Sequence, residues 1–133
     1  VKIMEHENEI VRDAFGLWIS GLFSAVCGWN PSRSFLEQKE IFFVLLEKLL
    51  REGTVMFIAP DVDCYFSTSN PSPRYTVEDP EARWNAPVHE IMNYVRGRWP
   101  KEAKQKNDVE LTYYFYELPG LIWVRADGGL FAS

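Results

Sequence analysis

The sequence predicts an α+β fold, in which a helical hairpin and a third helix pack on a small antiparallel sheet with a C-terminal hairpin. Three observations support this expectation. Residues 34–53 carry the start signal, the apolar middle and the end signal of a long helix. A further helical pattern begins at Pro87, and proline is common at the first position of a helix. Asp127-Gly128 stands between two apolar runs, which is typical of a β-hairpin turn.

The long helix begins with a capping box, in which Ser34 and Glu37 each satisfy a backbone N–H of the other residue. It ends with Lys48 and Arg51 in its last turns and with Gly53 where a left-handed residue is favoured. Its middle is apolar on every side, through Ile41, Phe42, Phe43, Val44, Leu45, Leu46 and Leu49. Other elements cover such a helix on several sides, so we expect it to be the central helix of the domain.

A first helix is predicted over residues 5–26, because small and apolar residues recur there at helical spacing. They are Ile10, Ala14, Leu17, Trp18, Gly21, Leu22 and Ala25. Gly16 and Gly21 each weaken a helix by about 1 kcal/mol relative to alanine, and Pro31 prevents its continuation. We expect residues 5–26 to pack antiparallel on residues 34–52 as a helical hairpin.

Strand-forming residues follow the central helix. Residues 55–59 form a short apolar run, and a third helix is predicted over residues 87–98. Residues 111–116 are aromatic and strand-like, and residues 121–125 and 130–132 form the predicted hairpin. This order is similar to that of winged-helix domains, in which a strand after the early helices joins the C-terminal hairpin. We therefore expect a winged-helix-like arrangement, with the first strand paired to the hairpin.

Residues 61–83 form the least regular stretch and are predicted to be a long irregular acidic loop. Three prolines lie there among small polar and acidic residues: Pro71, Pro73 and Pro80. A loop of this length inside a compact domain is either functional or mobile. The length of 133 residues and the average apolar content of 47% predict a single domain, 1–133, with a sizeable core.

The charge and the cysteine count limit the classes of function. The formal net charge is −5, which disfavours general binding to nucleic acid and suits a basic partner. Two cysteines, Cys27 and Cys64, are too few for a disulfide-rich secreted domain, so we expect free thiols and a cytoplasmic location. The sequence has no apolar signal segment at its start and no run of about 18 apolar residues, so we expect no association with a membrane.

No pattern of residues points to catalysis, a metal or a cofactor. Asp61 and Asp63 form a D-x-D pair, which is common, and a solvated acidic loop explains it without a metal. His89 is followed by glutamate, but Asn93 stands where a metalloprotease motif requires a second histidine. We therefore expect a protein that is not an enzyme and needs no cofactor.

Three groups of short motifs carry a resemblance to a known family. They are Glu37-Gln-Lys-Glu40 with residues 45–53, residues 84–91 with 98–102, and residues 114–119 with 121–124 and Asp127-Gly128. In these stretches the chain resembles a family of small bacterial proteins that is catalogued as a domain of unknown function. The resemblance covers the chain except residues 1–10 and 61–83. It implies that the motifs are fold signatures, and it implies an immunity protein, because some members accompany contact-dependent growth-inhibition or related toxin loci.

The first hypothesis is a cytoplasmic, non-catalytic protein-binding domain, such as an immunity protein that neutralises a basic toxin domain. Its contact surface would combine carboxylates and aromatic anchors of the acidic loop, namely Asp61, Asp63, Tyr65, Phe66, Glu78 and Asp79. The alternative is a winged-helix-like nucleic-acid-binding protein that uses helix 87–98 and the basic segment after it. Its phosphate contacts would come from Arg96, Arg98, Lys101, Lys104 and Lys106. The acidic net charge favours the first hypothesis.

Overall fold

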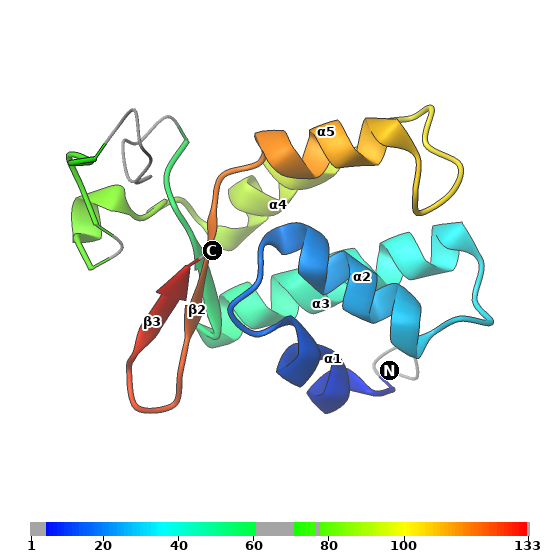
Figure 1. Cartoon of the computed structure of the whole chain (residues 1–133), viewed down its shortest axis with the longest axis horizontal. Coiled ribbons are helices and arrows are strands. Elements are labelled where there is room, and N and C mark those ends of the chain that lie inside the picture. The colour runs from blue at the N-terminus through cyan, green and yellow to red at the C-terminus, as the bar shows by residue number, and fades with distance from the viewer. Residues whose placement is uncertain (1–4, 61–70, 77, 133) are drawn as a thin grey trace.

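The computed structural model describes residues 5–60, 71–76 and 78–132 of the chain, and these form the predicted α+β fold. The helices are α1 (Glu7–Ala14), α2 (Ile19–Trp29), α3 (Phe35–Glu52), the short 3-10 helix η2 (Pro80–Ala82), α4 (Val88–Gly97) and α5 (Val109–Glu117). The strands are β1 (Val55–Phe57), β2 (Leu121–Val124) and β3 (Leu130–Ala132). Figure 1 shows the strands between the helices α1, α2, α3 and α5 on one side and the segment that contains residues 71–76 and 78–84 on the other.

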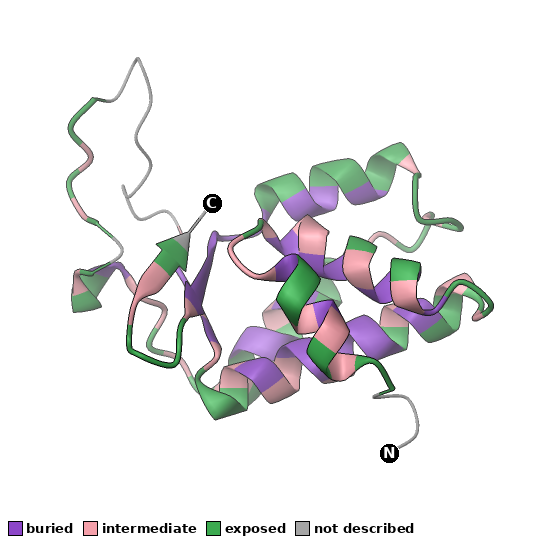
Figure 2. Cartoon of the chain, turned by 60° about the horizontal axis from the view of Figure 1, so that its bottom comes forward, coloured by how far each residue is buried: buried purple, intermediate pink, exposed green. Residues whose placement is uncertain are grey.

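The central helix α3 has the predicted ends and the predicted burial. The Glu37 backbone N–H donates to Ser34 Oγ at 3.1 Å, and the Ser34 N–H donates to Glu37 Oε1 at 3.0 Å. These bonds hold the pKa of the Glu37 carboxyl below its usual range. Gly53 ends the helix with a φ of 75°. Apart from half-buried Val44, residues 41–46 are buried, and α3 packs against α2, α4 and β1 (Figure 2). The central position of this helix is therefore confirmed.

The first helix differs from the prediction, because residues 5–26 form two helices instead of one. Gly16 has a φ of 82°, in the left-handed region that favours glycine and ends a helix. The chain turns there, so that α1 packs on α2 and buries Ile10 and Ala14. Leu17, expected in the buried stripe, lies in this turn and is exposed. The predicted hairpin on the central helix is formed by α2, while α1 reaches α3 through the ion pair of Glu7 with Lys48, at 2.7 Å.

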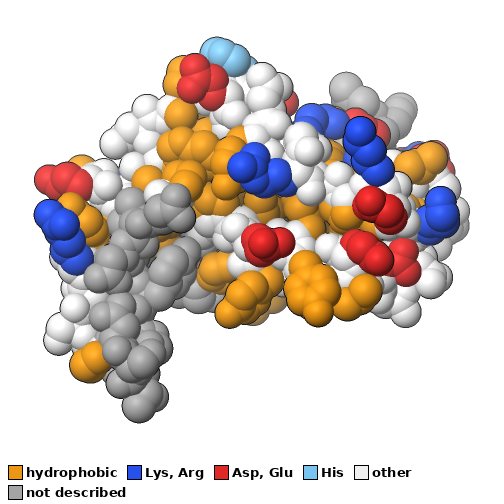
Figure 3. Space-filling view, turned by 90° about the horizontal axis from the view of Figure 1, so that it is seen from above, with side chains coloured by type: hydrophobic (Ala, Val, Ile, Leu, Met, Phe, Trp, Pro, Cys, Tyr) orange, Lys and Arg blue, Asp and Glu red, His pale blue; other side chains and the backbone are white. Residues whose placement is uncertain are grey.

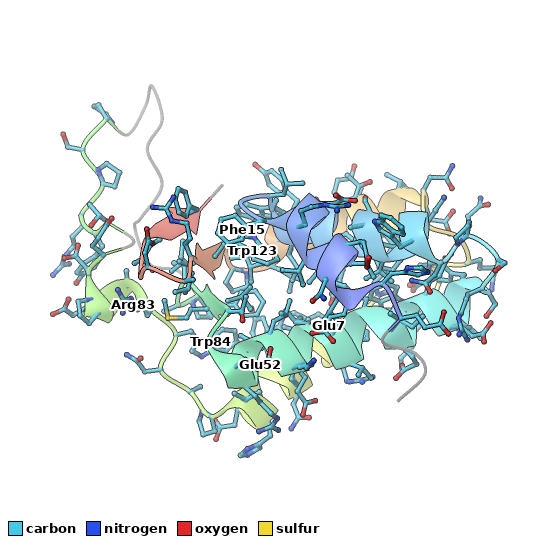
Figure 4. All side chains as sticks on the ribbon, turned by 90° about the horizontal axis from the view of Figure 1, so that it is seen from below. Glu7, Phe15, Glu52, Arg83, Trp84 and Trp123 are labelled. Atoms are coloured by element: carbon cyan, nitrogen blue, oxygen red, sulfur yellow. The ribbon has the colours of Figure 1, made fainter. Side chains whose placement is uncertain are left out.

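Two tryptophans hold the turn between α1 and α2. The buried Trp123 indole of β2 donates from Nε1 to the Leu17 carbonyl at 2.9 Å. Trp18 Nε1 donates to the Phe115 carbonyl of α5 at 2.9 Å. The ring of Phe15 lies 5.5 Å from the Trp123 ring, and Figure 4 shows the two residues next to each other. The turn thus joins the sheet to α5.

The predicted pairing of the first strand with the C-terminal hairpin is confirmed. β2 is the central strand, antiparallel to β1 on one side and to β3 on the other. In the hairpin turn the Arg125 N–H donates to the Gly129 carbonyl at 2.8 Å, and Gly128 has a φ of 91°. Hydrogen bonds from the Arg125 guanidinium and from the Gly129 N–H, which donates to Asp127 Oδ1 at 2.9 Å, hold the pKa of Asp127 below its usual range.

The prediction of a strand over residues 111–116 is wrong, because these residues belong to helix α5. The buried face of α5 has helical spacing and consists of Leu111, Tyr114 and Phe115. Among the described residues, two α-helices, α4 and α5, therefore separate β1 from the hairpin, whereas the winged-helix comparison led us to expect one. Figure 1 shows α5 lying across the molecule beside α2, with α4 behind it.

Aromatic rings fill the core between the helices. The Trp99 ring, just after α4, lies 5.3 to 6.3 Å from six other rings: Phe23, Phe35, Phe42, Phe43, Tyr114 and Phe115. These rings come from α2, from α3 and from α5. Pairs at such distances stabilise a core beyond the area that they bury, which accounts for much of the high aromatic content.

The end of the segment predicted as an irregular loop is attached to the sheet. Residues 80–82 form η2, and Ile58 and Arg83 form an antiparallel bridge. The Ala59 N–H donates to the Ala82 carbonyl at 2.8 Å, and the Trp84 N–H donates to the Phe57 carbonyl at 2.9 Å. The free edge of β1 is therefore covered by residues 82–84 (Figure 4).

Cys27 is a free thiol in α2, as predicted. Its Sγ lies 3.5 Å from Gln38 Oε1 of α3, to which the thiol donates. Burial raises the pKa of this thiol to about 11, although the Lys106 ammonium acts in the opposite direction. Cys64 lies outside the described residues.

Candidate protein-binding surface

The acidic residues predicted as a contact surface are described only in part. Asp61, Asp63, Tyr65 and Phe66 lie outside the described residues, whereas Glu78 is exposed and Asp79 is half-buried. Asp79 Oδ2 accepts the Thr76 backbone N–H at 2.8 Å, so this carboxylate stabilises a local turn. Of the two described carboxylates, Glu78 is the more accessible to a partner.

The basic residues proposed for nucleic-acid contact do not act as one cluster. Arg96 Nη1 lies 3.1 Å from Glu40 Oε2 of α3, and its guanidinium lies 4.6 Å from the centre of the Phe43 ring. The Arg98 guanidinium stacks 3.6 Å from the centre of the Tyr94 ring. Lys101, Lys104 and Lys106 are exposed in the segment after α4. Both arginines therefore have partners within the protein, which weakens the case for phosphate contacts.

The outer face of α5 carries an apolar surface that the sequence analysis missed. Val109, Tyr113 and Tyr116 are 56%, 64% and 81% exposed, and we call these three residues the α5 stripe. They are four and three positions apart, so their side chains share one face of the helix. Figure 2 shows this helix exposed along its outer side and buried along its inner side. The stripe is thus an apolar ridge with no role in the core.

Hydrogen bonds at the start of α5 and on its inner face hold this helix in place. The Asp108 carboxylate accepts the backbone N–H groups of Lys104 at 2.7 Å and Gln105 at 3.2 Å, which holds the pKa of Asp108 below its usual range. On the inner face, the Tyr114 hydroxyl donates to the Val95 carbonyl of α4 at 2.7 Å. Burial raises the pKa of this hydroxyl. The Tyr114 anchor fixes which face of α5 points outward.

A groove of about 450 Å³ runs between α2 and α5, next to the stripe. We call it the α2–α5 groove, and it is lined by Trp18, Ser20, Phe23, Ser24, Lys106, Leu111, Thr112, Phe115 and Tyr116. Figure 3 looks onto this side of the molecule and shows hydrophobic side chains gathered across its middle, with charged side chains around them. Exposed apolar patches with a polar rim mark interaction sites, and apolar clefts are typical of ligand sites, so this surface is a candidate for both.

Helix α5 carries acidic side chains next to the α5 stripe. Glu110 and Glu117 are exposed on the helix, and within the described part of the chain neither forms an ion pair. The groove has a single charged residue in its lining, Lys106. The surface thus offers tyrosine anchors next to unpaired carboxylates, the combination that we predicted for the acidic loop.

Other types of site lack support where the chain is described. Residues 5–60, 71–76 and 78–132 contain no cluster of three histidine, cysteine, aspartate or glutamate side chains suited to a metal ion. His89 lies exposed on α4. None of the described helices has both the length and the apolar character needed to cross a membrane.

Comparison with known proteins gives one likeness in fold. No protein-family model matches the chain, and no curated protein matches it. The solved structure of an uncharacterised protein conserved in bacteria, from Neisseria meningitidis, is similar with a TM-score of 0.66. The match covers 98% of this chain and 88% of that chain, at 19% sequence identity. At this identity the likeness concerns the fold alone, so the chain shares its α+β fold with a bacterial protein.

Proposed function

We propose that the chain is a small cytoplasmic protein of bacteria that acts without catalysis, by binding another protein. We further propose that the partner is a basic toxin domain, which this chain neutralises as an immunity protein. The observation that carries the proposal is the α5 stripe, with its two exposed tyrosines beside unpaired carboxylates.

The aromatic residues of the stripe support a protein partner. Tyrosine is enriched among the residues that contribute most to binding, because its ring buries a large area while its hydroxyl still finds a hydrogen bond. Tyr113 and Tyr116 are exposed, whereas Tyr114, between them in sequence, is buried. The chain therefore places two aromatic side chains in solvent on a helix whose other face already supplies the core.

The charge of the protein supports a basic partner. The whole chain carries −5, and Glu110 and Glu117 lie on the same helix as the stripe. Exposed carboxylates near a contact surface raise the association rate of a positively charged partner through electrostatic steering. Glu78 is a further exposed carboxylate for this purpose. The sequence adds Asp61 and Asp63, which lie outside the described residues.

The test begins with affinity capture of the tagged protein from its source bacterium and identification of the protein that co-purifies. The identified partner is then bound to wild type and to the double variant Tyr113→Ala with Tyr116→Ala in stopped-flow and dissociation experiments. We expect the double variant to raise the off-rate by an amount equivalent to about 1–2 kcal/mol or more. The matched control is Leu36→Ala, an exposed apolar residue on α3, which should leave the off-rate unchanged.

Charge variants separate the two acidic surfaces. Glu110→Gln with Glu117→Gln should mainly slow association and flatten its salt dependence, since exposed charges steer more than they hold. The same measurement on a variant with Asp61, Asp63, Glu78 and Asp79 neutralised tests the predicted loop. Wild-type kinetics for the double tyrosine variant would remove the stripe from the interface. Failure of co-expression to restore growth against the captured partner would overturn the immunity role.

A further inference from the structure

The α2–α5 groove has the dimensions and lining of a small-molecule site. Its volume of about 450 Å³ lies within the range of about 300–1,000 Å³ that is typical of ligand pockets. Three of its lining residues, Phe23, Leu111 and Phe115, are buried and give it an apolar floor. Two rings at its margin, Trp18 and Tyr116, extend this apolar surface.

The groove lining contains a few hydroxyl groups and one ammonium group. Ser20 and Ser24 belong to α2 and Thr112 belongs to α5, so hydroxyl groups come from both walls. The remaining polar residue is Lys106, in the segment that leads into α5. An apolar floor with a few polar groups is the composition that orients a ligand with one polar end.

Lys106 is the charged group of this site, and it has no carboxylate partner in the part of the chain that the structure describes. The nearest acidic residue in sequence, Asp108, uses its carboxylate to accept two backbone N–H groups of the same segment. The Lys106 charge also acts to lower the pKa of the Cys27 thiol of α2, which agrees with a position of Lys106 near the α2 wall of the groove. An unpaired ammonium beside an apolar floor complements an anion that carries an apolar body.

We propose that the α2–α5 groove binds a small amphipathic carboxylic acid. The aromatic or aliphatic body of the ligand lies against Phe23, Leu111 and Phe115, and its carboxylate accepts hydrogen bonds from Lys106. The hydroxyl groups of Ser24 and Thr112 are further donors within the same lining. The α5 stripe contributes only Tyr116 to this lining, so the ligand site does not depend on the proposed protein partner.

The probe is 4-phenylbutyrate, and its neutral amide, 4-phenylbutanamide, is the matched control ligand. Each is titrated into the full-length, ¹⁵N-labelled protein while amide chemical shifts are recorded. A dissociation constant on the order of 1 mM is expected for a ligand of this size. Saturable shifts should be confined to residues 18–24 and 106–116. The acid should bind about three- to tenfold more tightly than the amide at low salt.

Variants connect the binding to the named residues. Lys106→Met should reduce the affinity for the acid to that for the amide, whereas Lys104→Met, in the same segment, should preserve the difference. Ser24→Trp should fill the groove and abolish binding of both ligands, and Thr112→Trp does the same from the opposite wall if the first variant fails to fold.

Four results would overturn the proposal. They are no saturable shifts, shifts centred on other residues, equal affinity for the acid and the amide, or an advantage of the acid that survives Lys106→Met. Loss of protein-partner binding in the double tyrosine variant does not affect these outcomes, so the two proposals fail separately.

Discussion

Truncation of Leu45 tests the central position of α3. Leu45 is 1% exposed, so its side chain lies wholly within the core. Leu45→Ala removes three carbon atoms, and at about 0.8 kcal/mol for each the transfer term alone is about 2.4 kcal/mol. The cavity left behind adds to this, so the free energy of unfolding should fall by about 2–5 kcal/mol. With a urea m-value of about 2 kcal/mol/M, the middle of the range for small proteins, the midpoint of unfolding should fall by about 1–2.5 M.

Leu36→Ala is the matched control, because it makes the same chemical change on the same helix. Leu36 is 68% exposed, so its truncation should change the free energy of unfolding by no more than about 0.5 kcal/mol. Both variants can be unfolded in urea and followed by the fluorescence of the five tryptophans. A loss below about 0.5 kcal/mol for Leu45→Ala, or equal losses for the two variants, would refute the reasoning.

Three further predictions concern a buried hydroxyl, an acid-sensitive pair and nucleic acid. Tyr114→Phe should lower the free energy of unfolding by about 1 kcal/mol, because it removes the buried hydrogen bond to the Val95 carbonyl, whereas Tyr113→Phe should not change it; equal urea midpoints would contradict this. A hydrogen bond from Trp29 at 2.8 Å, and to a lesser extent one from Arg12, lowers the pKa of Asp13 in the folded protein from its ordinary value of 3.8. As the pH falls, Asp13 is therefore protonated in the unfolded chain before it is protonated in the folded protein. The stability that this carboxylate contributes is therefore complete above the unfolded pKa and is lost as the pH falls through the lower folded pKa. Asp13→Asn should flatten the acid side of a plot of the free energy of unfolding against pH. Duplex DNA should bind no tighter than about 10⁻⁴ to 10⁻⁶ M at physiological salt, and nanomolar binding lost in Arg96→Ala with Arg98→Ala in a titration would contradict this.

The features that the sequence predicted correctly depend on residues close together in the chain. The Ser34 and Glu37 capping box, the left-handed Gly53 and the Asp127-Gly128 turn are each complete within a few residues, and each appears as expected. The break at Gly16 is different, because apolar spacing continues across it. Its turn is held by the indole of Trp123, which is 106 positions away from its acceptor, Leu17. Sequence spacing alone contains no sign of such a bond.

The candidate site was harder to predict than the fold. Proximity in sequence grouped Arg96 with the lysines that follow it, but Arg96 pairs with Glu40, 56 positions away. The count of acidic residues pointed to segment 61–83, of which residues 61–70 and 77 lie outside the described residues. The α5 stripe was missed because its segment is rich in aromatic residues, which favour strands when judged by propensity. The helical spacing of Leu111, Tyr114 and Phe115 was the available signal.

The choice between strand and helix in this segment decides whether a binding surface exists. In a strand, residues two positions apart share a face, so Tyr113 would lie with Leu111 and Phe115 and would be buried with them. In the helix, Tyr113 instead shares a face with Val109 and Tyr116, while Leu111 and Phe115 turn inward. The same residues thus supply the core and a contact surface at once, because the helical period separates two groups that an alternating period would mix. The aromatic content of the chain has two sources for this reason: rings packed around Trp99 within the core, and tyrosines left in solvent on the opposite face of α5.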